Sequence, residues 1–148
     1  MNISNFFQEK NIFLDLKSNT KREFLQDLTQ RASNICKIET SVLFDAVMER
    51  ENLGSTGFGN GTALPHGRFA ELSDISIFFA RPTYPVDFDA IDKKPVDLVF
   101  LLVSPESAGA DHLTALAFLS RKLKDEIICK KLRQMNSEAE IYALLCEP

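Results

Sequence analysis

The chain has 148 residues, of which 45% are hydrophobic and 26% charged, a composition typical of a globular protein and not of a disordered or fibrous one. This length can bury a core without disulfides or a structural metal, so we expect one domain over residues 1–148. The net charge of −4 arises from 17 Lys and Arg against 21 Asp and Glu. It lacks the basic surplus of a protein that coats nucleic acid, so no nucleic-acid partner is expected.

Cysteine usage and the first residues of the chain indicate a cytoplasmic protein. Cys36, Cys129 and Cys146 form no CxxC pair and stand in helical, apolar contexts, so we interpret them as buried thiols in a reducing compartment. Residues 1–10 lack the basic and apolar regions of a signal peptide, and no stretch approaches the roughly 20 apolar residues of a membrane span. We therefore expect cytoplasmic localisation without membrane insertion.

The first third of the chain predicts a strand followed by two helices. Apolar residues alternate with period two over residues 12–16, as in a strand. Thr20 and Glu23 have the spacing of a capping box, and an apolar stripe of helical period follows them. A second helix is expected from about residue 40 to about residue 52, with Gly54 available for a left-handed stop.

The last half of the chain predicts two strands and two helices. Residues 75–80 and 97–104 have strand patterns, and the second strand is apolar on both faces, as in the centre of a sheet. A helix is expected over residues 112–124, and another after the capping box of Ser137 and Glu140. The first of these helices is expected to turn four residues inward: Leu113, Leu116, Ala117 and Leu123. Burial of the central strand on both faces implies helices on both sides of the sheet, which is an α/β layered fold.

Residues 50–67 form the most informative segment. Four of the six glycines lie within the eight positions 54–61, and glycine permits positive φ and a close approach of other groups to the backbone. Successive amides in such a loop can hold an anion. The candidate phosphoryl-loop residues are Ser55, Thr56, Gly57, Gly59, Asn60 and Gly61. Arg50, a bidentate partner for phosphate oxygens, precedes the loop. The segment matches neither a Walker A loop nor GxGxxG, and the alternative is an irregular connection without a ligand.

His66 is the candidate nucleophile. It lies between Pro65 and Gly67 at the end of this loop, where a side chain can be held and yet stay open on one side. An imidazole near its unperturbed pKa of ~6.5 is partly neutral at cell pH, so it can attack phosphorus and later leave.

His112 is the candidate second imidazole of the same site. Phosphoryl transfer depends on positioning and on neutralising the phosphoryl oxygens, which suits Arg50 together with another imidazole. His112 follows Asp111 at the expected start of a helix, where amides favour an anion. The alternative is that Asp111 caps the helix and that His112 is structural.

These residues together resemble the type-2 EIIA domains of the phosphoenolpyruvate-dependent phosphotransferase system, over essentially the whole chain. The form of residues 55–61 is most similar to the nitrogen-regulatory branch of that family. The matching segments are Arg50-Glu51, residues 54–61, Ala63-Leu64-Pro65-His66-Gly67, and residues 88–92, 95–98, 112–113 and 128–132. Thr62 departs from the family pattern, which usually has an aliphatic residue there.

The resemblance implies a mixed β-sheet with helices on both faces and the function of a phosphohistidine carrier. It makes His66 the phosphorylated residue, Arg50 an active-site cation and His112 the second active-site imidazole. The implied partners are a histidine phosphocarrier protein as donor and regulated target proteins or an EIIB domain as receivers, with no cofactor and no metal. One alternative is a sugar-transport component that passes phosphate to a fructose- or mannitol-type EIIB. Another, of a different class, is a module that binds an anion without covalent transfer.

Apolar residues near the loop have two interpretations. The residues concerned are Phe58, Leu64 and Phe69. They either belong to the core or form an apolar ring on which a phosphocarrier docks. Phe58, flanked by glycines, is the better candidate for docking. At least one of Phe78 and Phe79 should be buried, since they alternate in a strand. The charged residues 121–126 are expected to be a solvated helix face.

Overall fold

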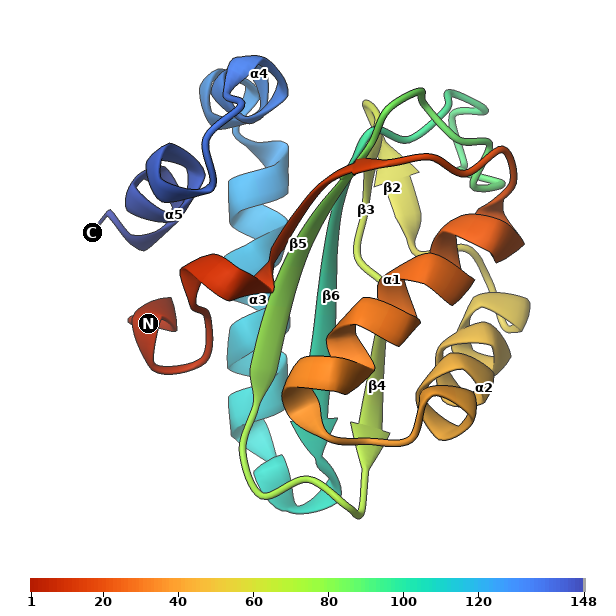
Figure 1. The fold of residues 1–148 in the computed structure, drawn as a ribbon, viewed down its shortest axis with the longest axis vertical. Helices are drawn as coiled ribbons and strands as arrows, with labels where there is room; N and C mark the ends of the chain where they lie inside the picture. Colours follow the sequence, from red (N-terminus) through yellow and green to blue (C-terminus); the bar gives the residue numbers. More distant parts are fainter. Residues whose placement is uncertain (148) are drawn as a thin grey trace.

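The computed structural model describes residues 1–147 and all their side chains except that of Phe58. Its centre is a mixed sheet in the order β1-β5-β6-β3-β2, and β4 also pairs with β6 (Figure 1). The strands are β1 (Ile12–Leu16), β2 (Gly57–Gly59), β3 (Thr62–Ala63), β4 (His66–Phe69), β5 (Ser76–Pro82) and β6 (Leu98–Pro105). The α-helices are α1 (Lys21–Cys36), α2 (Thr40–Asn52), α3 (Ala110–Lys124), α4 (Glu126–Gln134) and α5 (Glu138–Cys146). Short 3₁₀ turns are η1 (Ile3–Asn5), η2 (Glu9–Asn11) and η3 (Glu106–Ala108).

Strand β6 organises the sheet. All eight of its residues are buried, because it pairs antiparallel with β5 on one side and parallel with both β3 and β4, in succession, on the other. Leu98, Phe100 and Leu102 enter one apolar cluster, while the residues between them enter a second cluster on the opposite face. The expectation of a central strand apolar on both faces is confirmed, as is a layered α/β fold with a mixed sheet.

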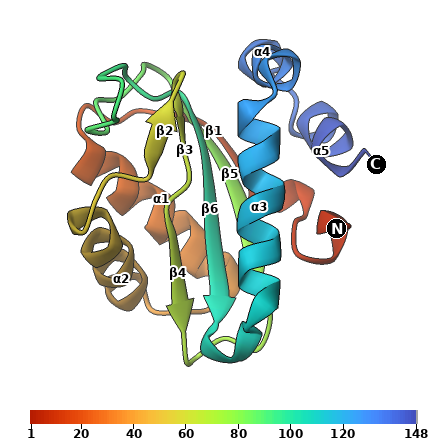
Figure 2. The same cartoon turned by 180° about the vertical axis from the view of Figure 1, so that it is seen from behind.

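Helices cover both faces of this sheet. Helices α1 and α2 lie on one side, and α3 with α4 and α5 lies on the other (Figures 1 and 2). The alternation in β5 sends Phe78 to the first layer and Phe79 to the second, and both rings are fully buried. Leu64 and Phe69 are core residues as well. The prediction that Phe58 forms part of a docking surface concerns a side chain that the structure does not describe.

The two predicted helix caps are confirmed, whereas the helix expected from residue 112 begins at Ala110. The hydroxyl of Thr20 accepts a hydrogen bond from the amide of Glu23 (3.1 Å), and the hydroxyl of Ser137 accepts one from the amide of Glu140 (3.3 Å). Helix α2 has the expected bounds. Gly54 has the positive φ (+154°) expected of a glycine that stops a helix. The cap residue before it, Leu53, is right-handed, and the amides of both residues donate back to the last turn of α2.

Two expectations about the later helices are confirmed only in part. Of the four residues expected to turn inward on α3, Leu123 is buried and Leu116 packs against the core, whereas Ala117 is exposed. The buried face of α3 otherwise consists of His112, Ala115 and Leu119. Leu113 is 63% exposed. The inward-facing stripe begins one residue earlier, at the polar residue His112, and each residue turns the direction of the side chain by about 100°. The charged run also crosses a helix boundary: α3 ends, and the carboxylate of Asp125 accepts from the amides of Ile127 and Ile128 and so starts α4.

The cysteines are three free thiols, of which only one fits the interpretation as buried. Cys129 is buried, whereas Cys36 and Cys146 are half-buried because they stand near the ends of α1 and α5. No helix within residues 1–147 is both long and apolar enough to cross a membrane.

Candidate functional site

His66 is the first residue of β4, at the open edge of the sheet between α2 and α3 (Figure 2). It pairs with Leu102 of β6, whose side chain enters the α3 layer. Paired residues of neighbouring strands point to the same face, so His66 and Arg68 both face α3. The edge position leaves the ring of His66 half-buried, accessible from one side.

A backbone carbonyl fixes the tautomer of His66. Its Nδ1 lies 2.9 Å from the carbonyl oxygen of Leu64. A carbonyl oxygen can only accept, so Nδ1 carries the hydrogen and the lone pair of the neutral ring is on Nε2. Burial lowers the pKa of His66, and the charge of Arg50 lowers it further, while the Leu64 carbonyl and the Glu51 charge act in the opposite direction. The ring is therefore a neutral nucleophile near pH 7.

His112 approaches His66 from the first turn of α3. The two ring centres are 5.8 Å apart, with the ring planes at 58°. His112 is 4% exposed, and its Nδ1 lies 2.7 Å from the hydroxyl of Ser104. Burial lowers the pKa of His112 to about 4, with smaller contributions from the charges of Arg68 and His66. The structure thus brings together two neutral imidazoles from β4 and α3.

Arg50 lies in the last turn of α2, near enough to His66 for its charge to depress the pKa of that imidazole. Its Nη1 donates to the carbonyl oxygen of Gly54 (2.9 Å), and this is the only hydrogen bond of the guanidinium to a described residue. The guanidinium has five N–H donors, so the others remain for an anion. Two imidazoles and one forked cation suit a phosphoryl group bonded to nitrogen.

Glu51 ties the loop to the body of the protein. Its buried carboxylate lies 2.9 Å from Nζ of Lys21 and accepts from the amide (3.0 Å) and the hydroxyl of Thr56. The neighbouring hydroxyl of Ser55 donates to the carbonyl of Phe88 (2.6 Å). These contacts connect the loop to α2 through Glu51, to α1 through Lys21, and to the connection between β5 and β6 through Phe88. The backbone that leads to His66 is therefore held by three parts of the fold.

The tip of the β2–β3 hairpin lies away from the histidines. Thr62 and His66 pair four residues apart along β6, which is about 13 Å at the rise of a strand. The amide of Asn60 donates to Asp92 (2.9 Å), and its carbonyl accepts from Arg133 (2.7 Å). Gly61 allows this packing, because its φ is +78° and a Cβ there would lie 2.8 Å from the Arg133 side chain.

The six candidate phosphoryl-loop residues therefore do not lie together around His66. The amides of Thr56, Gly57 and Asn60 already donate within the protein. Thr62, the departure from the family pattern, is buried, and its hydroxyl donates to the carbonyl of Gly59 (2.7 Å), so it closes the hairpin without an unpaired polar group.

Sequence reasoning missed three residues of the site. Ser104 is polar at the end of an apolar, fully buried strand, and this exception to the pattern was the available signal. Arg68 stands two residues after His66 in a strand, so it shares the same face. Glu51 is an acidic residue whose burial depends on tertiary contacts with Lys21, which no local pattern shows.

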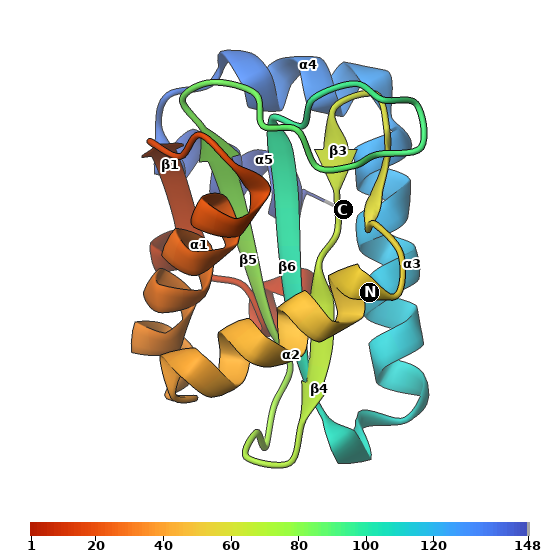
Figure 3. The same cartoon turned by 90° about the vertical axis from the view of Figure 1, so that its right-hand side faces the viewer.

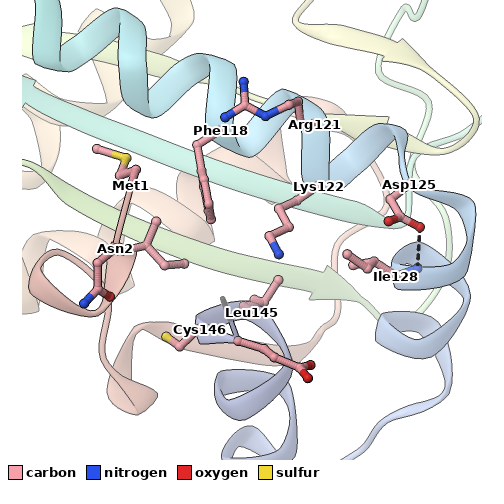
Figure 4. Close-up of a pocket in the computed structure, with 11 residues that line it drawn as sticks. Met1, Asn2, Phe118, Arg121, Lys122, Asp125, Ile128, Leu145 and Cys146 are labelled. Carbon is pink, nitrogen blue, oxygen red and sulfur yellow. Dashed lines mark hydrogen bonds between the residues drawn. The ribbon is translucent and has the colours of Figure 1, made fainter.

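A cavity of about 630 Å³ lies elsewhere, between the start of the chain and helices α3, α4 and α5 (Figure 4). Phe118, Arg121 and Lys122 line it from α3, and its lining contains neither histidine nor Arg50. The candidate site is thus the exposed edge around His66 and not an enclosed pocket.

Comparison with known proteins gives concordant matches. A family model described as phosphoenolpyruvate-dependent sugar phosphotransferase system, EIIA 2, matches residues 5–147. A nitrogen regulatory protein of Bradyrhizobium diazoefficiens is 43% identical over 148 residues, covering 100% of this chain and 97% of that protein. The crystal structure of nitrogen regulatory protein IIA-Ntr from Neisseria meningitidis has a TM-score of 0.92 at 34% identity, covering 97% of this chain and 98% of that one. IIA mannitol from Escherichia coli has a TM-score of 0.78 at 25% identity, covering 93% and 97%. The chain therefore belongs to the EIIA type-2 family of the phosphoenolpyruvate-dependent sugar phosphotransferase system, in its nitrogen-regulatory branch.

Proposed function

We propose that this protein is a phosphohistidine carrier of the nitrogen-related phosphotransferase system. His66 accepts a phosphoryl group from a histidine phosphocarrier protein, and the protein regulates its partners according to its phosphorylation state. The proposal is carried by the hydrogen bond from Nδ1 of His66 to the Leu64 carbonyl, which leaves a neutral ring with its lone pair on Nε2. That form of imidazole attacks phosphorus.

In the proposed step, Nε2 of His66 forms a bond to phosphorus while the P–N bond to the donor imidazole breaks. The electron pair of the broken bond returns to the donor nitrogen. The hydrogen on Nδ1 of His66 stays in place, held by the Leu64 carbonyl, so the phosphorylated ring is a cation and a good leaving group for onward transfer. The donor ring likewise keeps its own hydrogen, and atoms and charge balance.

Arg50 and His112 stabilise the transferring group in this proposal. The remaining N–H groups of the Arg50 guanidinium pair with phosphoryl oxygens, and the neutral ring of His112 donates one hydrogen bond to them. Such fixed donors act where the oxygens carry charge in the transition state.

The glycine-rich loop has a supporting task. The carbonyl of Gly54 holds Arg50, and the carbonyl of Thr56 accepts from the amide of Leu64 (3.1 Å), the residue that orients His66. Ser55, Thr56, Gly57, Gly59, Asn60 and Gly61 thus act by shaping the backbone on which the cation and the nucleophile are mounted.

Phosphorylation changes the charge at the rim of the site. A phosphoryl group adds about −1.5 to −2 charges at neutral pH, beside a half-buried ring and one arginine. A partner surface that fits the free rim is then repelled or newly attracted. In this reading the protein acts in the cytoplasm as a phosphotransferase component without a small-molecule substrate of its own.

Phosphorylation at His66 can be tested with purified components. The wild-type chain is incubated with phosphoenolpyruvate, Enzyme I and the phosphocarrier protein, and its intact mass is measured. We expect the mass of one phosphoryl group on the wild-type chain and none on His66→Ala. No gain on the wild-type chain, or an equal gain on the variant, would overturn the proposal.

Regulation of partners needs a second experiment. Proteins captured by the phosphorylated wild-type chain are compared with those captured by His66→Ala, which stays unphosphorylated. A regulator should retain at least one partner in a manner that depends on the phosphoryl group. Identical capture in both states would leave a carrier without the regulatory role.

The second candidate is a sugar-transport component that passes its phosphoryl group to an EIIB domain. The likeness to IIA mannitol favours it. A fructose- or mannitol-type EIIB added to the phosphorylated chain should then become phosphorylated as the chain loses its phosphoryl group.

The third candidate is a non-catalytic anion-binding module. It predicts no mass gain in the phosphorylation assay, but a higher stability of the folded chain in the presence of inorganic phosphate.

A further inference from the structure

Ser104 lies where a central strand meets the site. It belongs to β6, is fully buried, and follows a run of apolar residues. It is in register with Arg68 of β4, so its side chain faces α3. The hydroxyl oxygen lies 2.7 Å from Nδ1 of His112. A hydroxyl can donate or accept, and the choice decides which nitrogen of the neutral His112 ring carries the hydrogen.

A count of hydrogens decides the direction of this bond. If Nδ1 of His112 donated, the hydroxyl hydrogen of Ser104 would need another acceptor inside the protein. Among the described residues, the Nδ1 atom of His112 is the only hydrogen-bond partner of that hydroxyl. Burying an unpaired hydroxyl hydrogen costs free energy, whereas a bond from the hydroxyl to Nδ1 leaves neither group unpaired.

We propose that Ser104 is a positioning residue of the phosphoryl site, whose hydroxyl donates to Nδ1 of His112 and so holds the hydrogen of that ring on Nε2. The inference rests on the proposed function, because it gives this N–H a phosphoryl oxygen on His66 to bind. The two histidines are then held in opposite tautomers. His66, fixed by a carbonyl, presents a lone pair, while His112, fixed by a hydroxyl, presents a donor.

The geometry explains why the tautomer matters. With Nδ1 engaged by Ser104, the other nitrogen of His112 is the one left for a group on His66, whose ring centre is 5.8 Å away. In the opposite tautomer that nitrogen would present a lone pair to the negative oxygens and repel them. Fixing the tautomer in advance avoids reorganisation during transfer.

The tautomers can be measured directly on the unphosphorylated chain. Imidazole ¹⁵N chemical shifts at pH 7 distinguish protonated from unprotonated ring nitrogens, and the His66→Ala variant assigns the two rings. We expect the hydrogen of His66 on Nδ1 and that of His112 on Nε2. A His112 ring with its hydrogen on Nδ1 in the wild-type chain would overturn the proposal without any variant.

Substitution of Ser104 tests its role. Ser104→Ala should shift the Nδ1 resonance of His112 and slow phosphoryl transfer to His66 by roughly tenfold, as expected when one orienting hydrogen bond is lost. Ser104→Thr keeps a hydroxyl and should recover both properties. Ser76→Ala is the matched control. Ser76 pairs with Val103, the residue before Ser104, and so faces the α1 and α2 layer on the side of the sheet away from the two histidines.

Two outcomes with the variants would contradict the proposal. One is a Ser104→Ala chain with the wild-type Nδ1 shift and transfer rate. The other is a folded Ser104→Thr chain that is as slow as Ser104→Ala, which would assign a packing role to the side chain. A wild-type chain with the expected tautomers that accepts no phosphoryl group would instead remove the proposed function, so the two failures are distinguishable.

Discussion

Burial acts on the two histidines in the same direction but to different extents. His112 is 4% exposed and has a pKa of about 4, whereas His66 is half-buried with a lowered pKa. The difference follows from position, since one ring lies under the first turn of α3 and the other at an exposed sheet edge. The buried ring suits a fixed donor, and the edge ring suits a nucleophile that a donor protein must reach.

Removal of the second imidazole should slow transfer without unfolding the protein. We expect His112→Ala to lower the rate of phosphoryl transfer to His66 by about 10²-fold, the usual cost of losing one preorganised donor. Single-turnover transfer from the phosphorylated carrier measures this rate, and circular dichroism checks the fold. An unchanged rate would return His112 to a structural role.

A conservative change at Arg50 should be poorly tolerated. Lysine keeps the charge, but its donors share one nitrogen. Arg50→Lys therefore loses the planar fork that can donate to Gly54 and to phosphoryl oxygens at the same time. We expect transfer to fall by at least tenfold, about 1.4 kcal/mol in the barrier. The same single-turnover assay applies, with Arg121→Lys, in the remote cavity, as the control. Normal transfer by Arg50→Lys would remove Arg50 from the site.

The sequence singles out the two histidines of the candidate site more readily than the side chains that surround them. His66 and His112 were identifiable because imidazoles are scarce in this chain and one of them borders the glycine-rich loop. Ser104 and Arg68 become neighbours of His112 only when β4, β6 and α3 assemble, as the contact of Ser104 with His112 shows. A local pattern contains no information on such contacts, and the side chains that orient a site are therefore the hardest to predict.

At the scale of elements, the helix starts were predictable and the buried face of α3 was not. Thr20 and Ser137 cap their helices through hydrogen bonds that span three residues, so short-range sequence specifies them. The face of α3 depends on what it packs against, and there a polar residue, His112, points inward while Leu113 is exposed. Helix α4 escaped prediction because its cap, Asp125, stands inside a charged run.

The contact of α4 with the hairpin tip provides a test at this scale. Arg133 pairs with Asp97 (2.8 Å) and donates to the carbonyl of Asn60, so it joins three segments; α4 and the hairpin lie at the same end of the sheet in Figure 3. Arg133→Ala should lower the free energy of unfolding by about 1–2 kcal/mol, since bonds from a charged group are lost.

Another arginine–aspartate pair serves as the matched control for this variant. Arg31 and Asp27 pair at 2.9 Å within one turn of α1, on the surface. Arg31→Ala should cost less than about 0.5 kcal/mol, because such pairs contribute little. Urea denaturation of both variants gives the comparison. Equal losses of unfolding free energy in the two variants would contradict the prediction. They would mean that the contact of Arg133 with the hairpin stabilises the protein no more than an ordinary surface ion pair.

At the scale of the whole molecule, two apolar layers enclose a central strand while the site stays at the sheet edge. The core could be predicted from residues 98–103, which are apolar without a break and buried on both faces. The edge location could not, because it depends on β4 pairing with β6 in succession to β3. A nucleophile at an edge needs no opening of the core to meet a protein partner.

Global stability should depend on pH through the buried imidazole. Unfolded His112 binds a proton near pH 6.5, but the folded chain binds it only near pH 4. The unfolded state therefore gains protons first as pH falls, and about 3 kcal/mol of stability is lost between pH 6.5 and 4. Urea unfolding from pH 7.5 to 4.5 should show a smaller loss for His112→Gln than for the wild-type chain. Parallel curves for the two proteins would contradict this.

The lowered pKa of His66 also has a consequence when the pH inside the cell falls. A free imidazole would be half protonated, and so half unreactive, at pH 6.5. Burial at the sheet edge shifts that threshold to more acidic values. Under the proposed function, the unphosphorylated chain would therefore keep its capacity to accept a phosphoryl group through a moderate fall in pH. The phosphorylation state of His66 would then depend on the supply of phosphoryl donor and less on moderate changes in pH.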